Sequence, residues 1–394
     1  MPSAIIRGMK TTAGGRITDA SRSAYERLGV SPVINACGIY TEFGGSCLSP
    51  TVWEAASDVN ARFASMPELL ERSGELIAGL LGVEAARVVP GAAAGIALSV
   101  GACMTGGDGA RMEQLPDTTG MPGGVVMQRG HRYRYDRCAR LPGGRIVEVK
   151  GTPEDFRRAL DDRAACVFHP AHLDGSADTI PLPEVSALAR EAGVPVVVDA
   201  AFMVYPTELI GSYSDAGADL VCVSAKYFAG PNVGGFVYGR RDLVGAVGAI
   251  DFTGFEFGPH LIFGRAFKLD RTSVAATVLA LAEWLELDHD ARWTGYARSV
   301  ETLAELLRGV PGVTATAGGF TLDERVVDEP VNAVVVRGPG GSELDADRLA
   351  EELAIGRPSI RCVAMDGALV FCLETVLEGE LEQIAARVRE VLST

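Results

Sequence analysis

The strongest constraint on the fold is a repeated pairing of short apolar runs with helical or turn segments between residues 85 and 240. These runs have the length and the Val, Ile, Leu and Phe content of buried strands. They are Arg87–Pro90, Val125–Gln128, Ile146–Val149, Ala165–Phe168, Val194–Val198, Leu220–Val223 and Gly235–Tyr238. Such a rhythm is typical of an α/β domain built on a largely parallel sheet.

The length of 394 residues exceeds what one compact core usually holds, so two domains are expected. Residues 273–308 are strongly helical with a break around Asp288–Asp290, and residues 312–394 alternate strand-like runs with amphipathic helices. The first 24 residues are typical of a mobile arm. We expect an N-terminal arm and segment over residues 1–50 that packs on the small domain, a large domain over 51–285 and a small domain over 286–394.

Composition narrows the class of protein. Lys and Arg number 36 against 51 Asp and Glu, a formal charge of −15 that disfavours broad nucleic-acid binding. The eight Cys include no C-x-x-C pair, so no metal site is predicted, and their apolar contexts suggest free thiols in a reducing compartment. No signal peptide and no apolar run of membrane-spanning length is evident. We therefore expect a cytoplasmic protein that acts on a small molecule, away from membranes.

Three features that can carry chemistry lie directly after apolar runs. Gly91–Gly95 is a small-residue turn that opens a helix, Asp199 ends one run, and Lys226 follows another. Ligands of open α/β sheets collect at the carboxyl ends of the strands, so these features are expected to share one edge. The N–H groups at residues 91–95 can hold a phosphate, Asp199 can pair with a protonated ring nitrogen, and Lys226 can form an imine.

Each feature alone also has a structural explanation. A small-residue turn often serves close packing, an Asp after a strand commonly caps a helix, and a Lys in that place is usually solvated. Lys226, however, lies between an apolar strand and the turn Ala229–Asn232, a position at which a solvated surface charge is not expected. The ordered set therefore predicts a phosphate-bearing aromatic cofactor that is linked to Lys226.

A longer series of motifs resembles one known family. The motifs are Val33–Gly38, Gly44–Ser46, Gly91–Leu98, Leu115–Met121, Gln128–Arg132, Val198–Ala201 and Lys226 with Gly230–Pro231. In this order, over residues 25–394, the chain is similar to the selenocysteine synthase-like group of fold-type I pyridoxal 5′-phosphate (PLP) enzymes, and especially to its D-glucosaminate-6-phosphate ammonia-lyase branch. The resemblance implies an aspartate aminotransferase-like fold, with a three-layer α/β/α large domain, a small α+β C-terminal domain and a Schiff base between PLP and Lys226.

The resemblance also implies roles for individual residues. Lys226, Asp199 and His131 are the expected catalytic residues, with His131 stacked on the cofactor ring. The expected cofactor contacts are Gly91, Ala92, Ala93, His131, Asp199, Ala201, Ser224, Lys226 and Arg265. The expected substrate contacts are His169, His172 and Arg361, the last through a carboxylate. Structural roles stay open: the histidines can belong to the core or a loop, and either arginine can be a surface residue.

The predicted reaction begins with removal of the Cα proton of an amino acid or amino-sugar acid by the amine of Lys226. Loss of a β-leaving group then gives an enamine, and hydrolysis of the enamine by water releases ammonia and a 2-oxo acid. This reaction makes the protein a carbon–nitrogen lyase. An aminotransferase, a racemase or a β-replacement enzyme uses the same machinery, so these alternatives stay open. Selenium transfer to seryl-tRNA is less favoured because of the acidic charge, as is a PLP-binding protein without turnover.

Two departures from the lyase branch bear on the substrate. Ala229 stands where that branch often carries an Arg, and Leu373–Thr375 replaces its Asp-Pro-Arg element. Two potential contacts to an anion are therefore missing, which argues against a sugar phosphate.

The resemblance finally implies a homodimer or a multiple of dimers, because fold-type I sites are completed by a neighbouring subunit. Arg265, at the end of the aromatic-rich loop Phe255–Arg265, is the residue expected to reach the neighbour's site.

Overall fold

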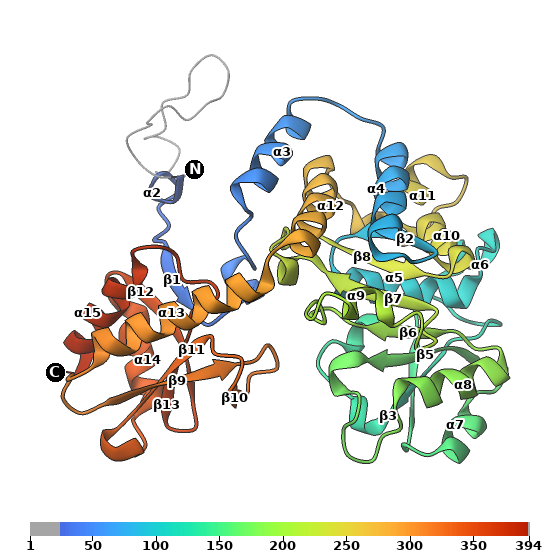
Figure 1. The fold of residues 1–394 in the computed structure, drawn as a ribbon. Helices are drawn as coiled ribbons and strands as arrows, with labels where there is room; N and C mark the ends of the chain where they lie inside the picture. Colours follow the sequence, from blue (N-terminus) through green and yellow to red (C-terminus); the bar gives the residue numbers. More distant parts are fainter. Residues whose placement is uncertain (1–23, 393–394) are drawn as a thin grey trace, which may run out of the picture. The chain divides into compact units, whose positions relative to one another are not determined.

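The structure is a computed structural model that describes residues 24–392, in two compact units (Figure 1). The larger unit is Tyr40–Leu287, and the smaller one combines the segments before and after it. Apart from its last residue, the arm expected over residues 1–24 lies outside the described residues. Residues 40–50, which the sequence analysis grouped with the N-terminal segment, belong to the larger unit because Thr41 and Ser46 hydrogen-bond to its Lys226 and Gly230.

A seven-stranded sheet runs through the larger unit in the order β2-β8-β7-β6-β5-β3-β4. Its strands are β2 (Ala85–Val89), β3 (Gly124–Gln128), β4 (Arg145–Val149), β5 (Ala164–Pro170), β6 (Val196–Asp199), β7 (Leu220–Ser224) and β8 (Gly235–Gly239). The five strands from β7 to β4 pair in parallel, whereas β8 runs antiparallel to both of its neighbours. Each apolar run of the sequence analysis forms a strand, and the prediction of a largely parallel sheet is confirmed.

Helices cover both faces of this sheet (Figure 1). On one face lie α3 (Pro50–Asn60), α4 (Met66–Leu81), α7 (Pro153–Ala159), α8 (Leu182–Ala192), α9 (Leu209–Ser212) and α12 (Arg271–Glu286). On the other lie α5 (Ala92–Thr105), α6 (Gly109–Gln114) and α10 (Arg241–Ile250), which α11 (Phe252–Phe257) follows. Side chains alternate along each strand, so that Val196 and Val198 face the first core and Val197 the second. The unit is therefore a three-layer α/β/α sandwich.

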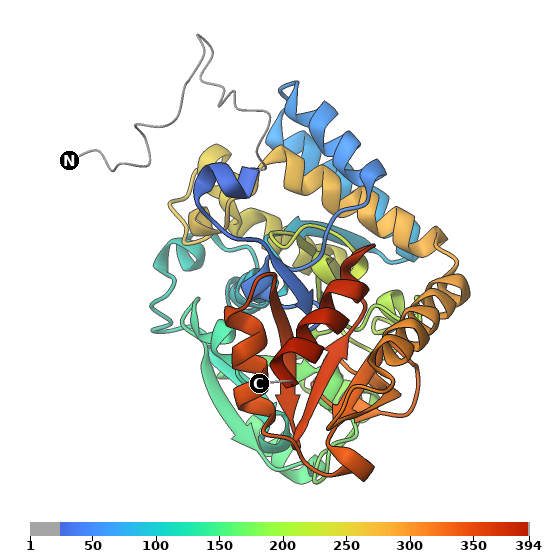
Figure 2. The same cartoon turned by 90° about the vertical axis from the view of Figure 1, so that its left-hand side faces the viewer.

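The smaller unit is an α+β structure around a six-stranded sheet of order β1-β12-β13-β11-β9-β10 (Figure 2). Its strands are β1 (Val33–Ala36), β9 (Thr314–Phe320), β10 (Val326–Val327), β11 (Ala333–Arg337), β12 (Ser359–Met365) and β13 (Ala368–Cys372). After the short α2 (Ala24–Leu28), β1 pairs in parallel with β12, which joins the two chain segments. One apolar core unites this sheet with α13 (His289–Leu307), α14 (Ala346–Ile355) and α15 (Glu380–Leu392).

Helix boundaries follow local sequence signals. The Thr152 hydroxyl accepts a hydrogen bond from the Asp155 N–H at the start of α7, and Pro153 occupies the first helical position. The expected break in the long helix separates α12 from α13, whose N-cap is Asp288. Between residues 24 and 392, no helix combines the length and apolar character that crossing a membrane requires.

Two glycines of α4 provide a test of how this helix packs on β2. A Cβ added at the buried Gly74 would lie 2.2 Å from the carbonyl oxygen of Ala86, whereas one added at the exposed Gly79 would meet nothing within 4 Å. Gly74→Ala should lower the free energy of unfolding by about 2 kcal/mol, because the helix must move away from a backbone atom. Gly79→Ala should raise it by up to about 1 kcal/mol, because Ala favours helix. Chemical denaturation of both variants measures this difference, and equal effects would contradict the close packing.

Candidate active site

The carboxyl ends of four parallel strands lie next to one another in the larger unit, because β3, β5, β6 and β7 are successive neighbours. His131 follows β3, His169 lies near the end of β5 with His172 just beyond it, Asp199 ends β6, and Lys226 follows β7. The structure therefore gathers at one edge of the sheet most of the side chains that the sequence analysis proposed for the site.

The turn at Gly91 joins the same edge. β2 runs in the direction of β7, so its carboxyl end, Gly91 and the start of α5 lie on that side. Gly91 has a φ of +93°, a conformation that glycine adopts readily. A Cβ on Gly235 would lie 2.3 Å from the Val223 carbonyl oxygen and 2.9 Å from the Gly91 Cα. Because Gly91 and Gly235 have no side chains, the Gly91 turn can approach the end of β7. No side chain of the described residues caps the N–H groups of the first turn of α5.

Asp199 is a buried carboxylate with two hydrogen-bond donors. The Ala201 N–H donates to its Oδ1 at 3.1 Å, and the Tyr133 hydroxyl donates to its Oδ2. Burial raises the pKa of Asp199, while the hydrogen bonds from Tyr133 and Ala201 act in the opposite direction. No cationic side chain among residues 24–392 forms an ion pair with it, so a cation supplied by a ligand would stabilise its charge.

Lys226 is buried in the short turn Ala225–Phe228. Its Nζ donates a hydrogen bond to the Thr41 hydroxyl at 2.8 Å and lies 4.8 Å from the centre of the Tyr227 ring. Burial lowers the pKa of Lys226, which increases the fraction of the neutral amine near pH 7. A neutral amine is the form of lysine that acts as a nucleophile or a base.

A chain of ring contacts connects the surroundings of Asp199 and Lys226. The ring of Tyr133 lies 5.1 Å from His172, His172 lies 5.2 Å from Phe202, and Phe202 lies 5.7 Å from Tyr227. The backbone adds a direct link, since the Ser224 N–H donates to the Ala201 carbonyl at 3.0 Å. The expected contacts Ala201 and Ser224 therefore tie the ends of β6 and β7 together, and His172 contacts the rings of Tyr133 and Phe202.

His131 and His169 form a buried pair beside this chain. Their rings meet edge to face, with centres 4.7 Å apart. Gln128 lies 3.4 Å from His131 Nδ1 and is itself fixed by two hydrogen bonds to the backbone of Ile180. Burial, followed by the neighbouring His169, lowers the pKa of His131 to about 4. His131 is therefore a neutral imidazole near pH 7.

Two expected arginines lie elsewhere in the structure. Arg265 pairs with Glu256 of α11, and both side chains are partly exposed. Arg361 lies on β12 of the smaller unit, opposite Asn35 of β1, and its Nε has no hydrogen-bond partner within the described part of the chain. Neither arginine has a recorded contact with Asp199 or Lys226, so their roles stay predictions.

Three residues of this edge were not foreseen from the sequence. Thr41 contacts Lys226 from a segment far away in the chain, Tyr133 contacts Asp199 from the loop after His131, and Tyr227 lies under the lysine amine. Only Tyr133 had a usable signal, because it lies two residues after a motif histidine.

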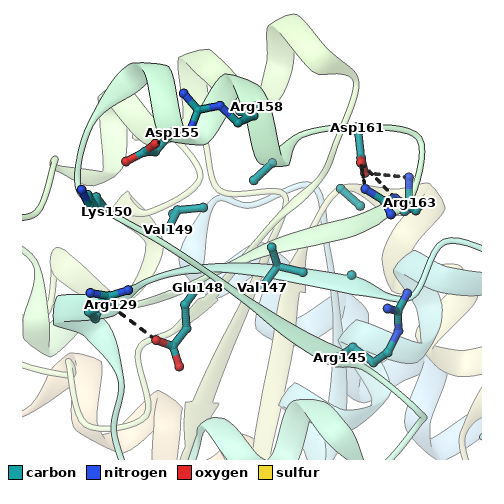
Figure 3. Close-up of a pocket in the computed structure, with 13 residues that line it drawn as sticks. Arg129, Arg145, Val147, Glu148, Val149, Lys150, Asp155, Arg158, Asp161 and Arg163 are labelled. Carbon is teal, nitrogen blue, oxygen red and sulfur yellow. Dashed lines mark hydrogen bonds and ion pairs between the residues drawn. The ribbon is translucent and has the colours of Figure 1, made fainter.

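A pocket at the β4 edge of the sheet contains none of the expected site residues (Figure 3). Its charged lining is Arg129, Arg145, Glu148, Lys150, Asp155, Arg158, Asp161 and Arg163. Three of these cations pair with its own carboxylates, namely Arg129 with Glu148, Arg158 with Asp155 and Arg163 with Asp161. The pocket is a charged surface feature of α7 and its neighbouring strands, separate from the residues at the carboxyl edge.

The low pKa of His131 predicts a specific response to acid. The unfolded chain takes up a proton near pH 6.5 and the folded one only near pH 4, so stability is complete above pH 6.5 and is lost as the pH falls. Between pH 7 and pH 5 this single group should remove about 2 kcal/mol from the free energy of unfolding. His131→Gln should abolish that part of the pH dependence, which denaturant unfolding at the two pH values measures.

If His131→Gln leaves the difference in stability between pH 7 and pH 5 as it is in the wild type, His131 is not a buried neutral imidazole.

Comparison with known proteins gives a consistent result. No family model matches the chain. A 5′-C-glycyluridine monooxygenase-decarboxylase from Streptomyces sp is 32% identical over 360 residues, or 88% of this chain and 85% of that protein. A D-glucosaminate-6-phosphate ammonia lyase from Salmonella typhimurium is 31% identical over 382 residues, or 93% and 97%. An L-seryl-tRNA(Sec) selenium transferase from Moorella thermoacetica is 25% identical over 429 residues, or 96% and 86%.

Solved structures support the same assignment. A structure of D-glucosaminate-6-phosphate ammonia-lyase matches with a TM-score of 0.82 and 29% identity, covering 95% of this chain and 99% of that one. A serine palmitoyltransferase from S. paucimobilis, with a TM-score of 0.52 and 14% identity over 91% and 87% of the two chains, shares the fold alone. The predicted fold class and cofactor are thereby confirmed. The chain belongs to the selenocysteine synthase-like family of fold-type I, PLP-dependent enzymes, which includes the D-glucosaminate-6-phosphate ammonia lyase.

Proposed function

We propose that this PLP-dependent enzyme is a carbon–nitrogen lyase that releases ammonia and a 2-oxo acid from an amino acid or amino-sugar acid. The observation that carries the proposal is the buried Lys226 amine with a lowered pKa, near Asp199 at one edge of the sheet. The similarity to the ammonia lyase, over 97% of that protein, supports elimination as the reaction.

The residues at this edge fit PLP group by group. The N–H groups of Ala92 and Ala93 at the start of α5, which no side chain of the described residues caps, suit the phosphate. The Gly91 N–H donates to the Val89 carbonyl at 2.7 Å, so we expect Gly91 to serve through its side-chain-free backbone. Asp199, a buried carboxylate with no ion pair within residues 24–392, suits a protonated ring nitrogen, and the buried Lys226 amine suits the aldehyde carbon. Each demand of the cofactor thus corresponds to a group of the protein at this edge.

When bound, PLP supplies an electron sink next to the substrate's Cα atom. Lys226 Nζ takes the proton from Cα, and Thr41 orients this amine through its hydroxyl. Asp199 holds a proton on the ring nitrogen, and Ala201 fixes the carboxylate from the other side. We assign ring stacking to His131, which is neutral and therefore does not compete for that proton.

The substrate contacts are proposed from the sequence expectations. His169 and His172 lie at the carboxyl end of β5, and Arg361 suits a carboxylate with its two-pronged guanidinium. The position at which the lyase branch carries an Asp-Pro-Arg element holds Glu374, a carboxyl group that accepts a hydrogen bond from Asn332 at 2.7 Å. Because Leu373–Thr375 lacks the arginine of that element, we expect an unphosphorylated substrate.

A second candidate activity is an oxygen-dependent decarboxylation. The monooxygenase-decarboxylase is as similar to this chain as the lyase is, with 32% against 31% identity. Loss of CO₂ from Cα uses the same cofactor, the same Asp199 and the same Lys226. It differs from elimination in its products and in the consumption of O₂, so the two activities are separable by assay.

The test is a screen of amino acids and amino-sugar acids with the PLP-loaded enzyme, in which ammonia, 2-oxo acid, CO₂ and dissolved O₂ are followed together. We expect ammonia and 2-oxo acid in equal amounts, without CO₂ and without loss of O₂. Release of CO₂ with consumption of O₂ would support the second activity instead. Ammonia that goes to an acceptor oxo acid would identify an aminotransferase.

Lys226→Ala is the matched control for this screen. The variant should lose the reaction by at least about 10³-fold, because both the cofactor link and the base are removed. Borohydride reduction of the wild type should fix the cofactor to the peptide that contains Lys226. A label on another lysine would show that the assignment of the site is wrong.

We further propose a cytoplasmic dimer or a multiple of dimers. All eight cysteines are free thiols, which suits a reducing compartment. In the larger unit, Trp53, Phe63, Phe257 and Leu261 are more than half exposed, which suits burial against a second copy. Within residues 24–392, Arg265 forms a partly exposed ion pair with Glu256. Such pairs contribute little to stability, so the Arg265 side chain can be available to a neighbouring site.

A mixed-subunit experiment tests whether Arg265 of one subunit contributes to the active site of its neighbour. Lys226→Ala and Arg265→Ala subunits are each expected to be nearly inactive alone. If Arg265 serves the neighbour's site, a mixed dimer holds one site with both lesions and one intact site, so activity should recover to about a quarter of the wild type after random exchange. Absence of recovery, with exchange shown by native mass spectrometry, would place Arg265 in its own subunit's site or outside any site.

A further inference from the structure

The contact between Tyr133 and Asp199 joins residues that are 66 positions apart in the chain. It is not a turn or a cap of β6, because Tyr133 comes from the loop after the short helix Arg129–His131. The Tyr133 hydroxyl donates to Oδ2, and the Ala201 N–H donates to Oδ1. A carboxylate has about four acceptor positions, so these two donors leave room for a third on the same group.

Packing fixes the Tyr133 ring before any ligand binds. The ring stacks on the fully buried Phe168 of β5 at 6.3 Å, with 25° between the planes, and meets the edge of His172 at 5.1 Å. Its backbone N–H donates to Asp136, whose carboxylate also pairs with Arg132. The hydroxyl is therefore held in one direction by both its ring and its backbone.

Burial keeps this hydroxyl a donor at every working pH. The pKa of Tyr133 lies well above its usual range, first because of burial and then because of the Asp199 charge. For Asp199, burial raises the pKa and the hydrogen bond from Tyr133 counteracts that rise. Tyr133 thus stabilises the anionic form of Asp199 without carrying a charge of its own.

Other titratable groups face this pair from several elements. They are Cys138 of the turn Asp136–Arg140, Cys222 of β7, Tyr227 of the turn after β7, and His172 against the Tyr133 ring. Burial raises the pKa of both thiols and brings that of Tyr227 to about 12. The thiols and Tyr227 are neutral near pH 7, so Tyr133 and Ala201 are the side-chain and backbone donors that support the Asp199 charge.

We propose that Tyr133 is a positioning residue that holds Asp199 as an anion in one orientation, and thereby keeps the ring nitrogen of the bound cofactor protonated. The inference rests on the proposed pairing of Asp199 with that nitrogen. A carboxylate that receives a hydrogen bond from Tyr133 is less basic, so the shared proton lies closer to the nitrogen. Without this donor, the proton moves toward Asp199, and the ring becomes a weaker electron sink.

The test places nitrogen-15 in the ring of PLP and records its resonance in the holoenzyme, since this resonance reports the position of the proton on the nitrogen. Tyr133→Phe keeps the ring that packs on Phe168 and removes the hydroxyl. Its resonance should move from the wild-type value toward that of unprotonated pyridine, by part of the shift that Asp199→Asn produces. Tyr135→Phe removes a neighbouring, half-exposed phenol and should leave the resonance unchanged.

A second replacement separates hydrogen bonding from packing. Tyr133→3,5-difluorotyrosine retains the hydroxyl and makes it a stronger donor, so its resonance should move the opposite way, toward fuller protonation. This variant also carries the test if Tyr133→Phe fails to fold or to bind PLP. If Tyr133 had only a structural role, the nitrogen resonance would shift in the same direction in both variants, or would not shift in either. Each of these results would overturn the inference.

The outcomes distinguish this inference from the proposed function. If Asp199→Asn shifts the resonance and both Tyr133 variants match the wild type, Asp199 is the ring partner and Tyr133 does not act through it. If Asp199→Asn leaves the resonance at its wild-type value, the pairing of Asp199 with the nitrogen is itself wrong, and the proposal for Tyr133 falls with it.

Discussion

The burial of one carboxylate, Asp199, is the constraint on which the active edge of this protein depends. A charge at the end of a central strand is costly unless donors or a cation compensate for it. The described residues supply two donors, from Ala201 and Tyr133, and no ion pair. In the site proposed above, the protonated ring nitrogen of PLP would supply the missing cation. The cofactor and the protein would then stabilise the same charge together.

Sheet topology explains why Lys226 lies at the same edge of the sheet as this carboxylate. β6 and β7 are parallel and adjacent, so the residues that follow them leave the sheet at the same edge. β8 then returns antiparallel, and the glycines at its start let the Gly91 turn approach the end of β7. In the proposed site, the backbone would thereby set the positions of the phosphate and of Lys226, whereas Asp199, Tyr133 and the histidines would form the environment of the cofactor ring.

The sequence predicts the framework of this edge because its strands are buried on both faces. Such strands form continuous apolar runs like Val196–Val198, and each ends in a residue that breaks the pattern, such as Asp199. Strand β9 was not predicted, because its sequence TATAGGF is half exposed and contains two glycines. Thr41 and Tyr133 were not predicted either, since loop contacts over long sequence separations have no period in the chain.

The chain has similar sequence identities to a lyase and to a monooxygenase-decarboxylase. This is expected if some residues hold the cofactor and others orient the substrate. In the proposed roles, Lys226, Asp199 and the Gly91 turn would serve any reaction that places negative charge on Cα, so they would not discriminate between the bonds to that atom. Discrimination requires residues that orient the substrate about Cα, and these come from other parts of the chain. His169 and His172 at the end of β5, and Arg361 in the separate smaller unit, are the groups on this chain that suit that task. On this proposal, the reaction is decided by the residues that orient the substrate rather than by those that hold the cofactor, so two relatives of similar identity to this chain can have different activities.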